Sequence, residues 1–126
     1  MRRETGDWEQ FRSLPDCVEI DVRDADARHD IPRWQSMMDV RRLALEALET
    51  AQREGKRFVL FVHGSPKVFV GRRTARSEIR LLLTAHIEAT PYLRRRDCIQ
   101  HDCVFVAAIR PLRGQRPEPD GTGDSD

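Results

Sequence analysis

Residues Phe58–Leu83 read FVLFVHGSPKVFVGRRTARSEIRLLL and form the centre of the predicted fold. Residues 58–62 form an unbroken apolar run of strand-forming residues, which predicts a strand buried on both faces. A loop with two glycines follows, and Thr74 then suits the start of a helix whose first turns carry several arginines. Strand, glycine loop and helix N-terminus in this order predict a site for an anion, because backbone N–H groups and the helix dipole favour negative charge.

Two patterns before this stretch predict a second strand and a long helix. Residues 17–22 read CVEIDV and alternate apolar with acidic side chains, as in a strand with one buried face. Residues 36–54 repeat apolar side chains every three or four positions, which predicts a helix capped by Ser36 and ended by Gly55. Because this helix separates the two strands, we expect a right-handed crossover and a parallel pair.

The patterns after this stretch complete the predicted fold. We expect a helix over 74–89 with Ile87 on its inward face, followed by strands at 98–100 and 103–109 joined by a turn at His101-Asp102. The resulting order is β-α-β-α-β-β, an α/β (α+β) two-layer sandwich in which two helices cover one sheet. Residues 1–16 read as an N-terminal extension, 17–113 as the domain, and 114–126 as a disordered acidic tail. In the extension, Trp8, Phe11 and Leu14 are spaced three apart, which suits either a docked helical turn or an arm that becomes ordered only in a complex.

Charge is strongly segregated along the chain although the net charge is only +1. Residues 1–55 carry 9 Arg and Lys against 13 Asp and Glu, whereas residues 56–116 carry 13 against 4. Such a basic half predicts a polyanionic partner. The three cysteines lack a CxxC pattern and no apolar run is long enough for a membrane span, so we expect a cytoplasmic protein with reduced thiols and no membrane partner.

The candidate catalytic residues are His63 and Asp21. His63 ends the central predicted strand, where a neutral imidazole can act as a general base and an imidazolium can hold a phosphate. Asp21 lies near the end of the neighbouring predicted strand, so it is expected at the same sheet edge, either orienting the imidazole or holding a divalent ion. The plainer alternatives are a histidine bonded to local backbone and a solvated carboxylate.

The candidate nucleic-acid-binding residues lie in the glycine loop and at the start of the second helix. They are Gly64, Lys67, Gly71, Arg72, Arg73, Arg76 and Arg80. Arg76 and Arg80 are four positions apart and share a helix face, and arginine forks match phosphate oxygens. The plainer alternative is ordinary surface arginine. Between these residues, the apolar triplet at 68–70 suits either a short extra strand or a flap over the site.

We expect no resident cofactor. Cys98, His101, Asp102 and Cys103 are metal-ligating residue types, but their C-x2-H-x-C spacing is not a standard zinc pattern and has no second half. The glycine motifs of nucleotide-binding loops and the GxSxG motif of serine hydrolases are absent.

These motifs resemble the Smr domain family, the small MutS-related module, over roughly residues 18–110. That family has a first strand ending in Asp-Leu-His-Gly, a helix, a strand ending in His-Gly-x-Gly, an arginine-bearing helix and two closing strands. Here His63-Gly64 matches the second motif, Gly71 its later glycine and Asp21 the aspartate of the first, but Arg23 stands where the first-motif histidine is expected. The resemblance implies a fold similar to the C-terminal domain of translation initiation factor three.

The resemblance also implies nucleic-acid binding, to DNA or RNA, in settings such as DNA repair or the ribosome. Our first hypothesis is a module that binds phosphate backbone through the His-Gly loop and the arginine-rich helix start. The second is an endonuclease that hydrolyses phosphodiesters, with His63 and Asp21 as catalytic residues and magnesium as its only implied cofactor. The third is a protein-interaction domain with an acidic partner. The missing first-motif histidine favours binding over cleavage.

Overall fold

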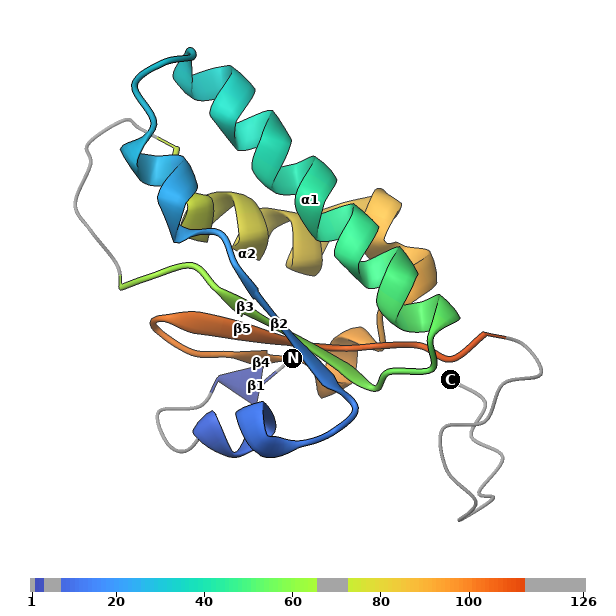
Figure 1. The fold of residues 1–126 in the computed structure, drawn as a ribbon. Helices are drawn as coiled ribbons and strands as arrows, with labels where there is room; N and C mark the ends of the chain where they lie inside the picture. The colour runs from blue at the N-terminus through green and yellow to red at the C-terminus, as the bar shows by residue number, and fades with distance from the viewer. Residues whose placement is uncertain (1, 4–7, 66–72, 113–126) are drawn as a thin grey trace.

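The computed structural model describes residues 2–3, 8–65 and 73–112. Lys67, Gly71, Arg72 and the apolar triplet 68–70 lie outside the described residues, as does the predicted tail. A single mixed sheet runs through the molecule in the strand order β1-β4-β5-β3-β2 (Figure 1). Its strands are β1 (Arg2–Arg3), β2 (Cys17–Asp21), β3 (Phe58–Val62), β4 (Ile99–Gln100) and β5 (Val104–Ala108).

The predicted order β-α-β-α-β-β is confirmed, with β1 as an additional two-residue strand. β2 and β3 are parallel, as expected from the helix between them, and β3 pairs antiparallel with β5. The turn at 101–103 connects β4 to β5 as an antiparallel pair, and its His101 N–H donates to Val104 O at 2.9 Å. β3 is therefore an interior strand, which explains its continuous apolar sequence.

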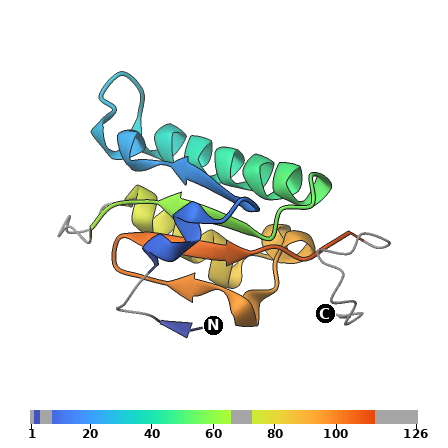
Figure 2. The ribbon, with the colours of Figure 1, turned by 60° about the horizontal axis from the view of Figure 1, so that its bottom comes forward.

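Both long helices, α1 (Arg33–Arg53) and α2 (Ala75–Ala85), lie on one face of the sheet (Figures 1 and 2). Side chains alternate along β3, so Val59 and Phe61 pack against the helices. The helices contribute the apolar stripes expected from their sequence, including Leu48 of α1 and Ile79 of α2. Burial of these stripes is the main force that holds the two layers together.

The opposite face of the sheet is covered by the N-terminal segment. Leu60 and Val62 of β3 pack there with Val104 and Val106 of β5, beneath Trp8 and Phe11. The Phe11 ring meets the Phe58 ring edge-on at a centroid distance of 5.1 Å. Within the described residues, the N-terminal segment thus packs on the sheet through Trp8 and Phe11. The short 3-10 helices are η1 (Glu9–Ser13), η2 (Arg23–Ala27), η3 (Ile87–Tyr92) and η4 (Arg95–Asp97).

The start of α1 corrects the sequence prediction, whereas its end confirms it. The helix begins at Arg33, and Ser36 is a buried helical residue whose hydroxyl donates to Ala25 O at 2.8 Å instead of capping the helix. Gly55 follows the helix with φ of +74°, and the Gly55 and Lys56 N–H groups bond back to the carbonyls of residues 52 and 51. In this glycine-ended arrangement, backbone N–H groups after the helix donate to its last carbonyls, which would otherwise have no partner in the chain.

The end of α2 is a second correction. The helix stops at Ala85, and Ile87, predicted to face inward, is 81% exposed at the start of η3. Arg95 provides the physical reason, because its guanidinium donates to Leu83 O at 2.9 Å and to the hydroxyl of Thr90 at 2.8 Å. A side chain that satisfies terminal carbonyls stabilises a helix end at that point. Among the described residues, no helix is both long and apolar enough to cross a membrane.

Candidate functional site at the carboxyl end of strand β3

Four segments meet where β3 ends. β2 and β3 are parallel with Asp21 opposite Val62, so both strands finish at the same sheet edge. β5 begins there, since Val104 lies opposite Val62. One edge of the sheet is therefore surrounded by four segments: the residues after β2, the residues after β3, the turn at 101–103 and the first turns of α2.

His63 is buried at this edge, with 2% of its surface exposed. Its backbone N–H and that of Gly64 both donate to Cys103 O, at 3.1 and 3.0 Å, which fixes the chain direction after β3. The ring Nδ1 lies 3.0 Å from Gly64 O, while Nε2 is buried and forms no hydrogen bond within the described part of the chain. Because Phe61 faces the helices, His63 two residues later projects toward the same side of the sheet.

The environment of His63 keeps the imidazole neutral. Burial lowers its pKa from 6.5 to about 4; the Gly64 carbonyl opposes this shift, and the positive charges of Arg76 and Arg80 add to it. A neutral ring at pH 7 can accept or donate a hydrogen bond but does not supply a positive charge to a ligand.

Arg76 and Arg80 reach from α2 across to the turn between β4 and β5. Arg76 Nε donates to Asp102 O at 3.1 Å, and Arg80 Nη2 donates to His101 O at 3.0 Å. The expectation that these two arginines share a helix face is confirmed by their contacts with successive carbonyls of one turn. Both guanidinium groups are therefore held in place at the edge where β3 ends.

Arg73, another predicted phosphate contact, forms an ion pair within the chain. Its Nε and Nη2 donate to the two carboxylate oxygens of Glu78, at 2.6 and 2.7 Å. Glu78 is only 3% exposed, and a buried carboxylate is costly unless it is paired and hydrogen-bonded. The charge of Arg73 is thus largely balanced within the protein.

The N-terminus of α2 already binds a carboxylate of the chain itself. Asp26 Oδ1 accepts from Ala75 N–H at 2.8 Å and from Arg33 Nη1 at 3.1 Å. Thr74 and Ser77 form a reciprocal capping box, in which each side chain bonds the other residue's N–H. The sequence predicted an anion site at this helix start. In the structure the carboxylate of Asp26, from the chain itself, stabilises it. This residue lies 49 positions earlier, and no local pattern predicted its contact.

Asp21 lies at the expected edge but does not orient His63. Its carboxylate accepts from Arg23, with Nε to Oδ1 at 3.0 Å and Nη2 to Oδ2 at 2.6 Å, and this lowers the pKa of Asp21. Because Asp21 is in register with Val62, its side chain lies on the sheet face opposite that of His63. In the described segments, no group of three or more His, Cys, Asp and Glu is arranged to hold a metal ion.

Arg23 and Gly64 bring the ends of β2 and β3 into contact. Gly64 has φ of +89°, and a Cβ added there would lie 3.4 Å from Arg23 Cγ. The positive φ explains why glycine follows His63, since side chains disfavour this conformation. The sequence marked Arg23 only as a departure from the family pattern, and its packing against Gly64 depends on the pairing of β2 with β3.

Comparisons with known proteins identify no relative: a scan of family models, a search of curated proteins and a search of solved structures each find no match. The fold and site define the chain as a mixed α/β domain with two arginines, Arg76 and Arg80, held beside a buried neutral histidine.

Proposed function

We propose that this chain is an Smr-like nucleic-acid-binding domain that contacts phosphate groups at the edge where β3 ends. The observation that carries the proposal is the guanidinium of Arg76. It is held by a neutral carbonyl of the turn, and no carboxylate among the described residues balances its charge. Arg80 lies one helical turn further along and bonds the neighbouring carbonyl.

This arrangement suits a phosphodiester. A guanidinium retains further N–H donors after bonding one carbonyl, and charge-assisted bonds to phosphate are among the strongest in proteins. The adjacent His63 is neutral, so phosphate binding rests on the arginines. Contacts of this kind position a nucleic acid without reading its sequence, and their strength falls steeply with salt.

Binding is favoured over cleavage by the geometry of the catalytic pair. His63 and Asp21 project from opposite faces of the sheet, and the carboxylate of Asp21 is engaged by Arg23. A general base must reach the proton it removes, and His63 is almost completely buried. The likeness to the C-terminal domain of translation initiation factor three belongs to the same proposal, which rests on the motifs and on the element order.

The test uses labelled hairpin RNA and branched DNA, incubated with and without magnesium and run on native and denaturing gels. We expect shifted, intact strands, and about fivefold to tenfold weaker binding by Arg76→Gln at low salt. Arg42→Gln is the matched control, because Arg42 is exposed on α1 and pairs with Asp39.

The other hypotheses give different outcomes. Strands that are cut by the natural protein but not by His63→Ala would assign an endonuclease instead. Binding of an acidic protein that heparin does not compete away would assign the third hypothesis. The absence of any shift would overturn the proposal.

A further inference from the structure

A groove of about 280 Å³ runs between strand β2 and helix α1, away from the end of β3. Val18 and Ile20 of β2 form one wall, and Leu43 and Ala47 of α1 form the other. Leu43 is 42% exposed, so part of its apolar side chain faces solvent in the groove. The groove therefore presents an apolar surface directly beside a strand.

That strand is the edge of the sheet. β2 is the last strand in the sheet order, and Figure 2 shows it outermost, next to α1. Val22 N–H donates to Val62 O, and strand residues alternate in direction, so Glu19 and Asp21 direct their backbone N–H and C=O groups away from β3. No backbone hydrogen bond from the described residues reaches these outward groups. They are a template for one more strand.

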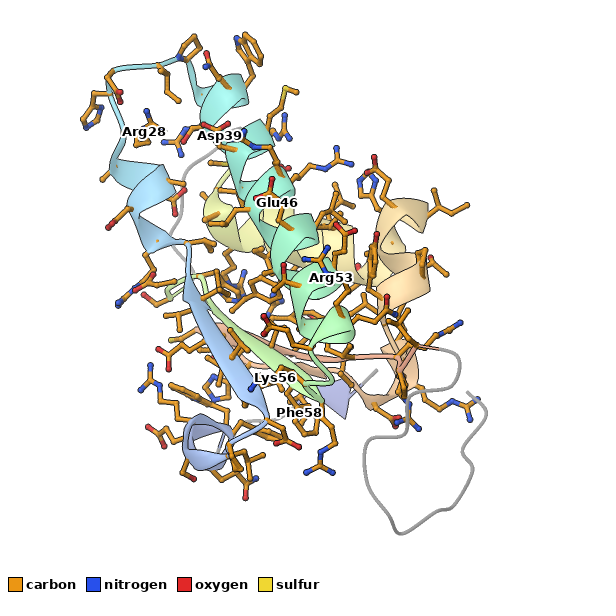
Figure 3. All side chains as sticks on the ribbon, turned by 45° about the vertical axis from the view of Figure 1, so that its right-hand side comes forward. Arg28, Asp39, Glu46, Arg53, Lys56 and Phe58 are labelled. Atoms are coloured by element: carbon orange, nitrogen blue, oxygen red, sulfur yellow. The ribbon has the colours of Figure 1, made fainter. Side chains whose placement is uncertain are left out.

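The rim of the groove is acidic and uncompensated. Glu46 and Glu54 line it, and neither forms an ion pair with any described residue. Other carboxylates of α1 are paired: Asp39 lies beside Arg28, as Figure 3 shows, and Glu49 pairs with Arg53. The two free carboxylates favour an occupant with basic residues at its ends.

We propose that this groove binds an extended peptide segment of a partner protein, which adds to β2 as a further strand. Its main chain bonds the outward groups of Glu19 and Asp21. Alternate apolar side chains enter the groove, and basic side chains on the same face meet Glu46 and Glu54. A second copy of β2 (Cys17–Asp21, CVEID) is a poorer occupant, because this strand has no basic side chain to meet Glu46 and Glu54.

The probe is the peptide acetyl-KTVTVTK-amide, in which the lysines and valines share one face. We expect saturable binding with a Kd on the order of 0.1 mM, typical of a small added strand. Amide hydrogen exchange at Glu19 and Asp21 should slow when the peptide binds. The same peptide N-methylated at the amides that face β2 should not bind, because it cannot form the ladder.

A charge reversal tests the specificity. Glu46→Lys/Glu54→Lys should weaken the lysine peptide at least tenfold and gain affinity for acetyl-ETVTVTE-amide. The control Glu9→Lys/Glu49→Lys makes the same change in net charge outside the groove and should bind as the natural protein does. Equal binding of the N-methylated peptide, or equal loss in both variants, would overturn the proposal. Protection of both amides without peptide, together with concentration-dependent mass, would assign the edge to a second copy and overturn it as well.

Discussion

The side chain of Arg23 lies against Gly64, so the residue after strand β2 covers the turn after strand β3. Arg23 is held there by Asp21, which it engages through two nitrogens and its backbone N–H. These contacts connect the ends of β2 and β3 on one face of the sheet, whereas His63 lies on the opposite face. This relationship makes Asp21 and Arg23 a structural pair.

The conformation of Gly64 predicts the effect of adding a methyl group. Gly64→Ala should lower the free energy of unfolding by about 1–2 kcal/mol, because φ of +89° is strained for alanine. The contact with Arg23 is an ordinary one, so Gly55→Ala, at φ of +74° in open space, should cost a similar amount. Urea denaturation of both variants measures this, and an unchanged midpoint for Gly64→Ala would contradict the backbone geometry.

Substitution of Arg73 should mainly lower stability, whereas substitution of Arg76 should mainly weaken binding. Arg73→Ala leaves the buried carboxylate of Glu78 without its partner and should cost about 2–3 kcal/mol of unfolding free energy. Arg76→Gln removes a contact with a carbonyl at the exposed edge and should cost less than about 1 kcal/mol. Thermal and urea unfolding of the two variants provide the comparison. Equal losses would mean that the Arg73–Glu78 pair does not have the structural role assigned here.

Asp26 should be required for the position of α2. Asp26→Ala removes the acceptor for Ala75 N–H and the partner of Arg33, and we expect a loss of about 1–2 kcal/mol of unfolding free energy. Asp24→Ala is the control, because Asp24 lies in the same short helix and is exposed. It should change the unfolding free energy by less than about 0.5 kcal/mol. A control that is as damaging as Asp26→Ala would show that the carboxylate of Asp26 does not cap the helix.

The depressed pKa of His63 predicts a loss of stability in acid. The folded pKa of about 4 lies below the unfolded value of 6.5, so the unfolded state takes up a proton first as the pH falls. The contribution of this group to stability is therefore constant above about pH 6.5. Between pH 6.5 and pH 4 it falls by about 1.4 kcal/mol per unit.

Two measurements check this pH dependence. The unfolding free energy of His63→Gln should vary less with pH over that window than that of the natural protein. In a proton NMR titration, the His63 ring should remain neutral down to about pH 5. A ring that titrates near 6.5 would show that His63 is not buried in the folded state.

The sequence predicted the elements whose signals are local. The apolar run at 58–62, the alternation in 17–22, the cap at Thr74 and the stop at Gly55 each report a neighbourhood of a few residues, and all four are found. Two predicted helix bounds were wrong. α1 begins three residues early because the carbonyl of Pro32 accepts its first N–H groups, and Arg95 bonds the carbonyls that end α2.

The candidate site shows the same division. His63 at the end of an interior strand follows from the sequence, as does the shared face of Arg76 and Arg80. The internal roles of Asp26 and Glu78 could not be predicted, because nothing in the local sequence distinguishes these two carboxylates from the other acidic residues. Their partners are identified only by the folded structure. The face of the sheet on which Asp21 projects also depends on the register of β2 with β3. A shift of this register by one residue would place the side chain on the opposite face.

Whether Arg76 contacts a phosphate is tested by the salt dependence of hairpin RNA binding by the natural protein, Arg76→Gln and the control Arg42→Gln. If Arg76 contacts a phosphate, its variant should bind more weakly at low salt, and the slope of log affinity against log salt should be smaller by about one. Arg42→Gln should match the natural protein in both respects. If Arg76→Gln has the same affinity and the same slope as the natural protein, Arg76 does not contact a phosphate.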